Sequence, residues 1–167
     1  MASKSFSMSQ ISEQGLQQAL ENTGASAGLI LLLNGNGPTI GASQHLPTDF
    51  LTIARQSLPD FEFDHDHTDR NGGPLIIEDV NSAVFTPPML ALESRKLQFR
   101  TLVIAPISVQ KGTLGILAML YPDATSLSRQ HRQLISGICN QLGVTIQNSQ
   151  LWEELRRKEK LRAGLLN

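Results

Sequence analysis

The chain has 167 residues, of which 40% are hydrophobic and 17% charged, and its formal net charge is −1. This length suits a single domain with its own core, and the near-neutral charge excludes a broad basic surface for nucleic acid, leaving at most a local patch. The single cysteine excludes an intrachain disulfide framework, and no apolar run approaches the roughly 20 residues of a membrane-spanning helix. We therefore expect a soluble cytoplasmic domain that contacts neither nucleic acid nor a membrane.

The first third of the chain predicts a helix, a hairpin and a second helix. Its expected elements are a helix over Met8–Thr23, strands over Ala27–Leu33 and Thr39–His45 joined by turn residues at Asn34–Pro38, and a helix over Thr48–Leu58. The helices show apolar residues at helical spacing, and Gly24 follows the first as a stop. The unbroken apolar run Ala27–Leu33 is typical of a strand that is covered on both faces.

The rest of the chain predicts a long polar loop, a second hairpin and a long final helix. The expected elements are a loop over Pro59–Pro74, a strand over Pro74–Val80, a helix begun near Pro88, strands over Arg100–Gln110 and Thr113–Tyr121, and a helix capped by Ser126 or Ser128 that continues to the end. Pro106 is awkward inside a strand, because proline donates no ladder hydrogen bond. Two hairpins without regular strand–helix–strand alternation predict an α+β domain with a mostly antiparallel sheet.

The final helix carries two apolar stripes. One recurs at three- and four-residue spacing early in the helix and is expected to pack on the sheet. The other is a heptad seam spaced alternately by four and three, and it comprises Val144, Asn148, Leu151, Leu155, Lys158, Arg162 and Leu165. This seam predicts a parallel homodimer whose interface includes Val144, Asn148, Leu151, Leu155 and Leu165. Lys158 and Arg162 are poor inner residues, and Glu154 would face Glu159 across the pair, so a solvated helix with internal ion pairs is the alternative.

Two groups of residues carry possible chemistry. The segment "FEFDHDHTD" supplies potential zinc or iron ligands at Asp64, His65, Asp66 and His67, although a solvated acidic loop is the better interpretation. Cys139 lies in the apolar part of the last helix, where a cysteine is usually a small core residue. The sequence contains no matched nucleophile–base set, dinucleotide motif or P-loop, so we expect no catalytic residues.

Nearly the whole chain, from about Ser9 to Leu155, resembles a GAF domain. The resemblance is carried by the stretch "FRTLVIAPISVQKGTLGILAMLYPDATSLSRQHRQLISGICNQLGVTIQNSQLWEEL", by "PLIIEDV" as the middle strand, and by "TGASAGLILLLNGNG" near the beginning. The family also accommodates a proline in the strand that matches Arg100–Gln110, where Pro106 lies. The tail "LWEELRRKEKLRAGLLN" resembles the helix through which GAF domains lead into the dimerisation helices of sensor histidine kinases.

This resemblance implies terminal helices on one sheet face and a ligand pocket on the other. It also implies a flexible leader over residues 1–8, a sensor domain over 9–150 and a connector helix over 151–167 toward an output kinase domain. The implied ligand-binding residues are Ile77, Glu78, Asp79, Phe85, Leu90, Phe99, Arg100 and Thr101. Two of these have ordinary alternatives, because Asp79 can cap the next turn and Arg100 can be a surface arginine.

The chain departs from the enzymatic and pigment-binding members of the family. It lacks the asparagine-lysine-phenylalanine-aspartate-glutamate motif of the cyclic-nucleotide phosphodiesterases, a middle-segment cysteine for a bilin, and the several cysteines of the methionine-sulfoxide reductases. We therefore expect a non-enzymatic sensory domain that binds an unidentified small molecule and signals as a homodimer through its terminal helices; the sequence names no cofactor. The alternatives are a ligand-free dimerisation scaffold and a metal or redox sensor that uses the Asp64–Asp69 cluster.

Overall fold

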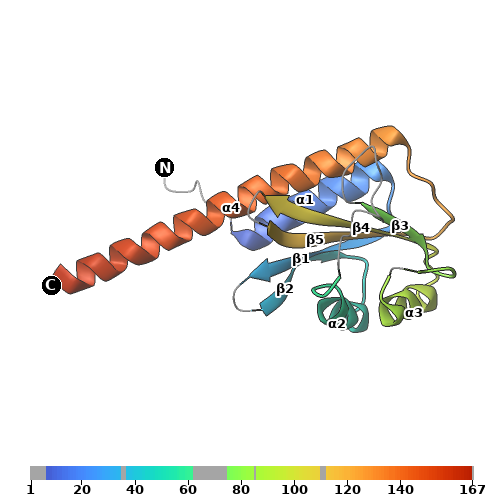
Figure 1. Cartoon of the computed structure of the whole chain (residues 1–167), viewed down its shortest axis with the longest axis horizontal. Coiled ribbons are helices and arrows are strands. Elements are labelled where there is room, and N and C mark those ends of the chain that lie inside the picture. Colours follow the sequence, from blue (N-terminus) through green and yellow to red (C-terminus); the bar gives the residue numbers. More distant parts are fainter. Residues whose placement is uncertain (1–6, 35–36, 62–74, 85, 110–111, 167) are drawn as a thin grey trace.

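A five-stranded sheet lies between two layers of helices in the computed structural model of the chain (Figure 1). The structure describes residues 7–34, 37–61, 75–84, 86–109 and 112–166. The strands are β1 (Ala27–Asn34), β2 (Gly37–Gln44), β3 (Ile76–Asp79), β4 (Thr101–Val109) and β5 (Gly112–Tyr121). The helices are α1 (Met8–Thr23), α2 (Thr48–Ser57), α3 (Pro88–Lys96) and α4 (Arg129–Leu166).

The strand order β2-β1-β5-β4-β3 joins two hairpins through an antiparallel β1–β5 pair. Every neighbouring pair is antiparallel, which confirms the predicted α+β class. In the described part of the chain, β3 pairs only with Thr101–Ile104 of β4, so Pro106 lies beyond the stretch that β3 covers. Because β3 does not extend to position 106, it needs no backbone N–H from this residue, and a proline is tolerated there.

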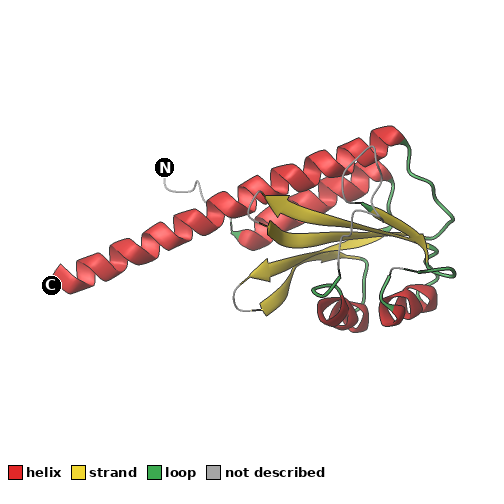
Figure 2. Cartoon of the chain, viewed as in Figure 1, coloured by secondary structure: helices red, strands yellow, loops and turns green. Residues whose placement is uncertain are grey.

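Both faces of the sheet are buried, as Figure 2 shows. Helices α1 and α4 cover one face, and α2 and α3 cover the other. Alternate residues of β4 therefore enter different cores: Val103 and Ala105 belong to the α1/α4 cluster, whereas Leu102 and Ile104 belong to the α2/α3 cluster. Antiparallel strands usually alternate apolar and polar residues, so the unbroken apolar runs reflect this double coverage.

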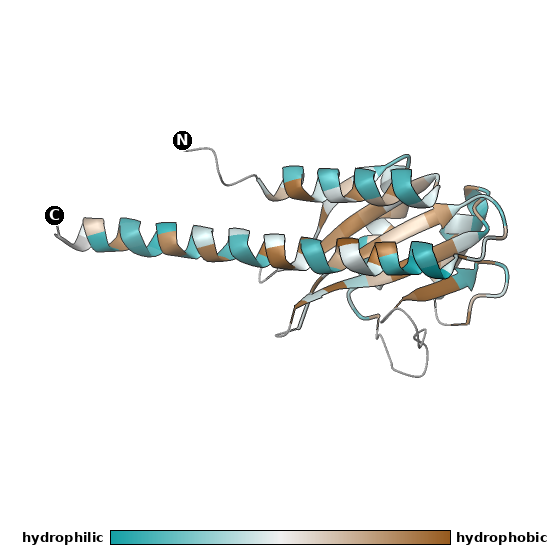
Figure 3. Cartoon of the chain, turned by 90° about the horizontal axis from the view of Figure 1, so that it is seen from above, coloured by the Kyte–Doolittle hydropathy of each residue, from teal (hydrophilic) through white to brown (hydrophobic). Residues whose placement is uncertain are grey.

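Helix α4 is the longest element, with 38 residues, and only its first half lies on the sheet. Seen from above, α1 and α4 lie side by side and α4 continues well past the end of the sheet (Figure 3). Of the two candidate caps of α4, Ser126 and Ser128, it is Ser128 whose Oγ accepts a hydrogen bond from the His131 amide, at 3.1 Å. All residues from Leu151 to Gly164 are exposed.

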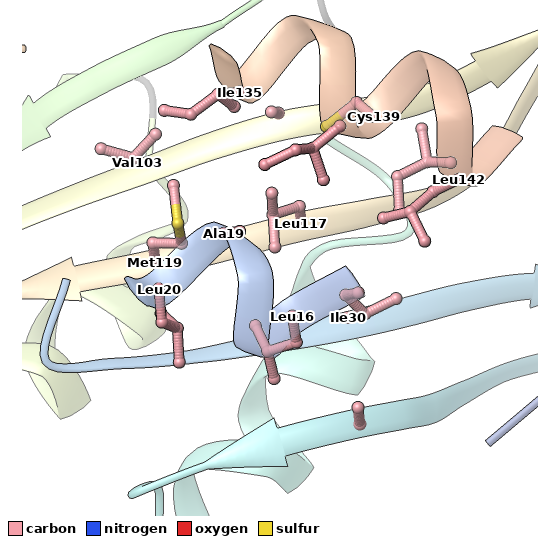
Figure 4. Packing of buried hydrophobic residues seen from close by; sticks show 14 of the residues in the cluster. Leu16, Ala19, Leu20, Ile30, Val103, Leu117, Met119, Ile135, Cys139 and Leu142 are labelled. Atoms are coloured by element: carbon pink, nitrogen blue, oxygen red, sulfur yellow. The ribbon is translucent and has the colours of Figure 1, made fainter. Parts of the chain in front are cut away.

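Close contacts fix the first half of α4 against its neighbours (Figure 4). A methyl group added at Gly15 of α1 would lie 2.5 Å from Cδ2 of Leu142, so the missing side chain is what admits this leucine. On the β4 side, a methyl group added at Gly143 would lie 2.8 Å from the backbone oxygen of Ser108. These two glycines let α4 pack closely against both α1 and the β4–β5 hairpin.

Two glycine substitutions in α4 test this close packing. We expect Gly143→Ala to lower the free energy of unfolding by about 1–3 kcal/mol, because the new methyl group meets the backbone oxygen of Ser108, which cannot rotate away as a side chain can. Gly137→Ala is the matched control, since nothing lies within 4 Å of its added methyl group. It should raise stability by up to about 1 kcal/mol through helix propensity alone. Urea unfolding of both variants measures the difference, and equal effects at the two sites would contradict the close approach.

Candidate functional site

Four of the predicted ligand-binding residues lie at the sheet edge where β3 ends and β4 begins. Asp79 pairs with Thr101 across these two strands, and Glu78 pairs with Leu102. The backbone of Arg100 continues the arrangement, because its carbonyl accepts from the Val80 amide at 2.8 Å. Four polar predicted residues are thus neighbours in space.

The Glu78 carboxylate holds the loop that connects β3 to α3. One oxygen accepts from the Val84 amide at 3.3 Å, and the other accepts from the Thr86 amide at 2.8 Å and from the Thr86 hydroxyl. The residue is only 9% exposed, so these bonds replace the water that a buried carboxylate has lost. Glu78 therefore organises the loop through its own hydrogen bonds.

Asp79 and Arg100 form the exposed part of the same edge. One oxygen of Asp79 accepts from the Asn81 amide at 2.9 Å, which is the turn-capping alternative weighed from the sequence. The other oxygen accepts from Nε of Arg100 at 3.3 Å. Arg100 is 52% exposed, so this ion pair is screened by solvent and contributes little to stability.

Thr101 links this edge to the loop that precedes α4. Its hydroxyl donates to the Asp123 carbonyl at 2.7 Å and accepts from the Thr125 amide at 3.0 Å. Thr101 itself is 3% exposed, and both bonds are partly buried. A continuous set of hydrogen bonds and strand pairs therefore runs from the β3–α3 loop to the segment leading into α4.

The remaining predicted residues are divided between the two sheet faces. Leu90 is fully buried in the α2/α3 cluster, and Phe99 packs against the same cluster. Ile77 instead packs against the α1/α4 cluster on the opposite face, so the structure does not bring it together with the others. Phe85 lies outside the described residues.

A groove of about 320 Å³ lies beside the Glu78-anchored loop, and sequence reasoning missed it. It is lined by Asn81, Ala83, Val84, Thr86, Pro87, Pro88, Ala91 and Arg95. One guanidinium nitrogen of Arg95 donates to the Val80 carbonyl at 2.8 Å, which fixes α3 against the end of β3. Neither Thr86 nor Arg95 stands out in the sequence, because their roles depend on contacts across the β3–α3 connection.

The possible metal ligands Asp64, His65, Asp66 and His67 all lie outside the described residues. Within the described ranges, no group of three or more histidine, cysteine, aspartate or glutamate residues could hold a metal ion. Cys139 is 4% exposed in the α1/α4 core, and burial raises the pKa of its thiol to about 12. The thiol is therefore protonated at neutral pH, as expected for a core residue.

The predicted dimer seam lies on the side of α4 that faces away from the sheet. Val144, Leu151 and Leu155 are 54%, 52% and 53% exposed, and Asn148 is also exposed. The side chain of Leu165 is outside the described residues. Two further exposed apolar residues, Trp152 and Leu161, flank the seam and were not predicted as part of it. The tail of α4 thus presents a row of apolar side chains to solvent.

A second groove of about 230 Å³ runs between α1 and α4. Its apolar floor is formed by Ile11, Ile138 and Leu142, and glutamine side chains occupy much of its rim. The exposed positions of α1 are polar throughout; they are Ser9, Gln10, Glu13, Gln14, Gln17, Gln18, Glu21 and Asn22. The large exposed apolar side chains of this helical layer therefore belong to α4.

Comparisons with known proteins agree with this architecture. The family model described as "GAF domain" matches residues 7–147. A domain assigned to a two-component sensor histidine kinase of Sinorhizobium meliloti 1021 superimposes with a TM-score of 0.69 at 18% identity, covering 92% of this chain and 99% of that one. The GAF domain/HD domain protein of Geobacter sulfurreducens gives a TM-score of 0.67 at 14% identity, covering 87% and 95%.

A third similar structure is the GAF domain of a two-component sensor histidine kinase from Bacillus halodurans. Its TM-score is 0.58 at 11% identity, and the match covers 84% of this chain and 96% of that one. At such identities these likenesses concern the fold alone. No functionally curated protein matches the sequence.

The fold and the paired polar edge define a small α+β domain with one sheet between two helical layers. The family match extends over most of its length, and the chain belongs to the GAF family. The domain is accordingly of a sensory type. None of the helices in the described ranges is long and apolar enough to cross a membrane.

Neighbouring carboxylates at the end of β3 provide a matched test of this site. We expect Glu78→Gln to lower the free energy of unfolding by about 1–3 kcal/mol, because whichever way the amide is oriented its nitrogen faces a loop N–H, that of Val84 or that of Thr86, and cannot accept from it. Asp79→Asn keeps the oxygen that caps the Asn81 turn and loses only an exposed ion pair, so its cost should stay below about 1 kcal/mol. Urea denaturation checks both values. Equal costs would contradict the anchoring role of Glu78.

Proposed function

We propose that this GAF domain is the sensory input module of a two-component signalling protein and that α4 is its output. The observation that carries the proposal is the division of α4 into a half that is packed on the sheet and a half that is exposed beyond it. A rigid helix that belongs to the core at one end transmits small shifts of that core to whatever is attached at its other end. A histidine kinase domain, covalently linked in the cytoplasm, is the proposed recipient.

The hydrogen bonds at the sheet edge supply a route from the input side to α4. Glu78 holds the β3–α3 loop, and Thr101 holds the segment before α4. The two residues lie on adjacent paired strands, so a displacement of the loop reaches the start of the output helix through strand pairing and side-chain hydrogen bonds. A ligand drives this change only if it binds one arrangement better than the other.

The proposed input is a small molecule bound on the α2/α3 side of the sheet. Leu90 and Phe99 supply apolar contacts on this side, and the β3–β4 edge supplies polar groups. We expect a compound that binds there to raise the melting temperature, since ligand at 100 times its Kd adds about 2.7 kcal/mol. Thermal-shift screening of a metabolite library measures this effect.

Substitutions of Phe99 and Ile77, two half-buried predicted residues on opposite sheet faces, test where such a compound binds. Phe99→Ala should weaken or abolish the thermal shift, whereas Ile77→Ala should preserve it, because Ile77 packs against the α1/α4 cluster. A shift preserved equally in both variants would place the ligand elsewhere. If no compound class raises the melting temperature, a ligand-free relay scaffold is favoured. The hydrogen bonds that Glu78, Asp79 and Thr101 make within the protein support that alternative.

A metal or redox sensor through the Asp64–Asp69 cluster is tested by metal analysis of the purified protein.

The proposed signalling state is a homodimer formed through the exposed half of α4. Seam residues Val144, Leu151 and Leu155 have about half of their surface available to a second copy. Asn148 occupies an inner position between them, and paired asparagines favour a parallel, in-register dimer. The polar outer surface of α1 makes α4 the main source of apolar contact.

A cysteine at the seam tests the dimer directly. We expect Asn148→Cys to form an intermolecular disulfide on mild oxidation, because inner residues at the same level of a parallel pair lie close together. The control Lys160→Cys lies on the opposite side of α4 from the seam and should remain uncross-linked. Native Cys139 does not compete, since it is buried in the core. Non-reducing electrophoresis reports the result, and equal cross-linking of both variants would contradict the proposed interface.

A further inference from the structure

Lys158 is the least explained residue of the α4 seam. Its ammonium lies 3.8 Å from a carboxylate oxygen of Glu154, one turn earlier on the same helix. The two side chains are 72% and 58% exposed, so this pair alone contributes very little to stability. A solvated ion pair does not account for a lysine at an inner position of this seam.

The heptad positions place three charges close together in a parallel pair of α4 helices. With Asn148 and Leu155 at inner positions a, Lys158 falls at inner position d. Glu154 and Glu159 then occupy the flanking positions g and e, which face each other across a parallel dimer. Two facing glutamates repel, so this part of the seam requires a positive charge.

A residue at d packs directly beside the e residue of the opposite helix in a parallel coiled coil. We infer that Lys158 is an intermolecular ion-pair residue, with its ammonium lying between Glu154 of its own helix and Glu159 of the partner subunit. The inference rests on the proposed dimer and identifies what sets its register. Two symmetric lysines offset the two glutamate pairs that would otherwise drive the helices apart.

The ionic layer and the apolar layers have different roles in this arrangement. Val144, Leu151 and Leu155 supply apolar burial, which is insensitive to small errors of alignment. The ionic layer is satisfied only when position 158 meets position 159 of the other helix, which requires parallel helices in register. Charged groups at such positions lower affinity and raise specificity.

A charge exchange between two variants tests the inference. In Lys158→Glu alone, each new glutamate faces Glu159 of the partner subunit, and in Glu159→Lys alone, each new lysine faces Lys158 of the partner subunit. The Lys158→Glu homodimer, whose layer then holds only carboxylates, should therefore dissociate with a Kd at least about tenfold higher than that of the unaltered chain. In the Glu159→Lys homodimer, attraction between the new lysine and Glu154 of the partner subunit offsets part of the repulsion between lysines, so its Kd should rise less. In an equimolar mixture, every altered position meets its opposite charge, so a heterodimer should form in preference to either homodimer.

Sedimentation velocity with one variant fluorescently labelled measures this recovery. Lys160→Glu carries the same charge change on the opposite side of α4 and should leave the Kd of the dimer unchanged. Circular dichroism of each variant confirms that the helix is retained, and recovery in the mixture excludes misfolding as the cause of dissociation.

The outcomes separate the inference from the proposal on which it rests. If the unaltered chain is monomeric at every concentration, the proposed dimer is wrong and the ionic layer fails with it. If the unaltered chain is dimeric but the mixture shows no preference for heterodimer, the dimer stands and the role of Lys158 is overturned. Preferential heterodimer formation supports the inference, because only parallel, in-register helices bring positions 158 and 159 together.

Discussion

Burial of both faces of one antiparallel sheet is the constraint on which the rest of this structure depends. Strands such as β5 are apolar at successive positions, so a single helical layer would leave half of their side chains in water. Two layers are required, and β4 serves both by sending Val103 to one cluster and Ile104 to the other. Because β1, β4 and β5 belong to both cores, neither layer moves without adjustment of the other, and close-packed interiors transmit such strain.

This shared sheet places the candidate input and the proposed output on opposite sides while keeping them mechanically connected. The α2/α3 layer carries the loop anchored by Glu78, and the α1/α4 layer carries the long helix. Thr101 bypasses the apolar core by bonding directly to the segment before α4.

Periodicity predicted most of the fold but little of the site's internal bonding. The bounds of α1 matched the prediction, since a spaced apolar face and a glycine stop are local signals, and one of the two candidate caps of α4, Ser128, was correct. The face of Ile77 was not predictable, because β3 has only four residues and both of its faces are covered. The bonds of Thr101 join residues more than 20 positions apart, so they depend on strand register that local sequence does not encode.

The charged residues of the α4 tail are best understood through the energy that a relay requires. A seam made wholly of leucine would pair so strongly that the binding of a small molecule, with a coupling free energy of typically about 1–3 kcal/mol, could not alter it. Asn148 and Lys158 interrupt the apolar row of Val144, Leu151 and Leu155, which lowers the affinity of the proposed dimer while retaining its register. Packing on the sheet holds the first half of the helix, so this weaker pairing is confined to the half that extends beyond the domain. The imperfect seam is therefore consistent with a helix that must change its pairing in response to the sheet.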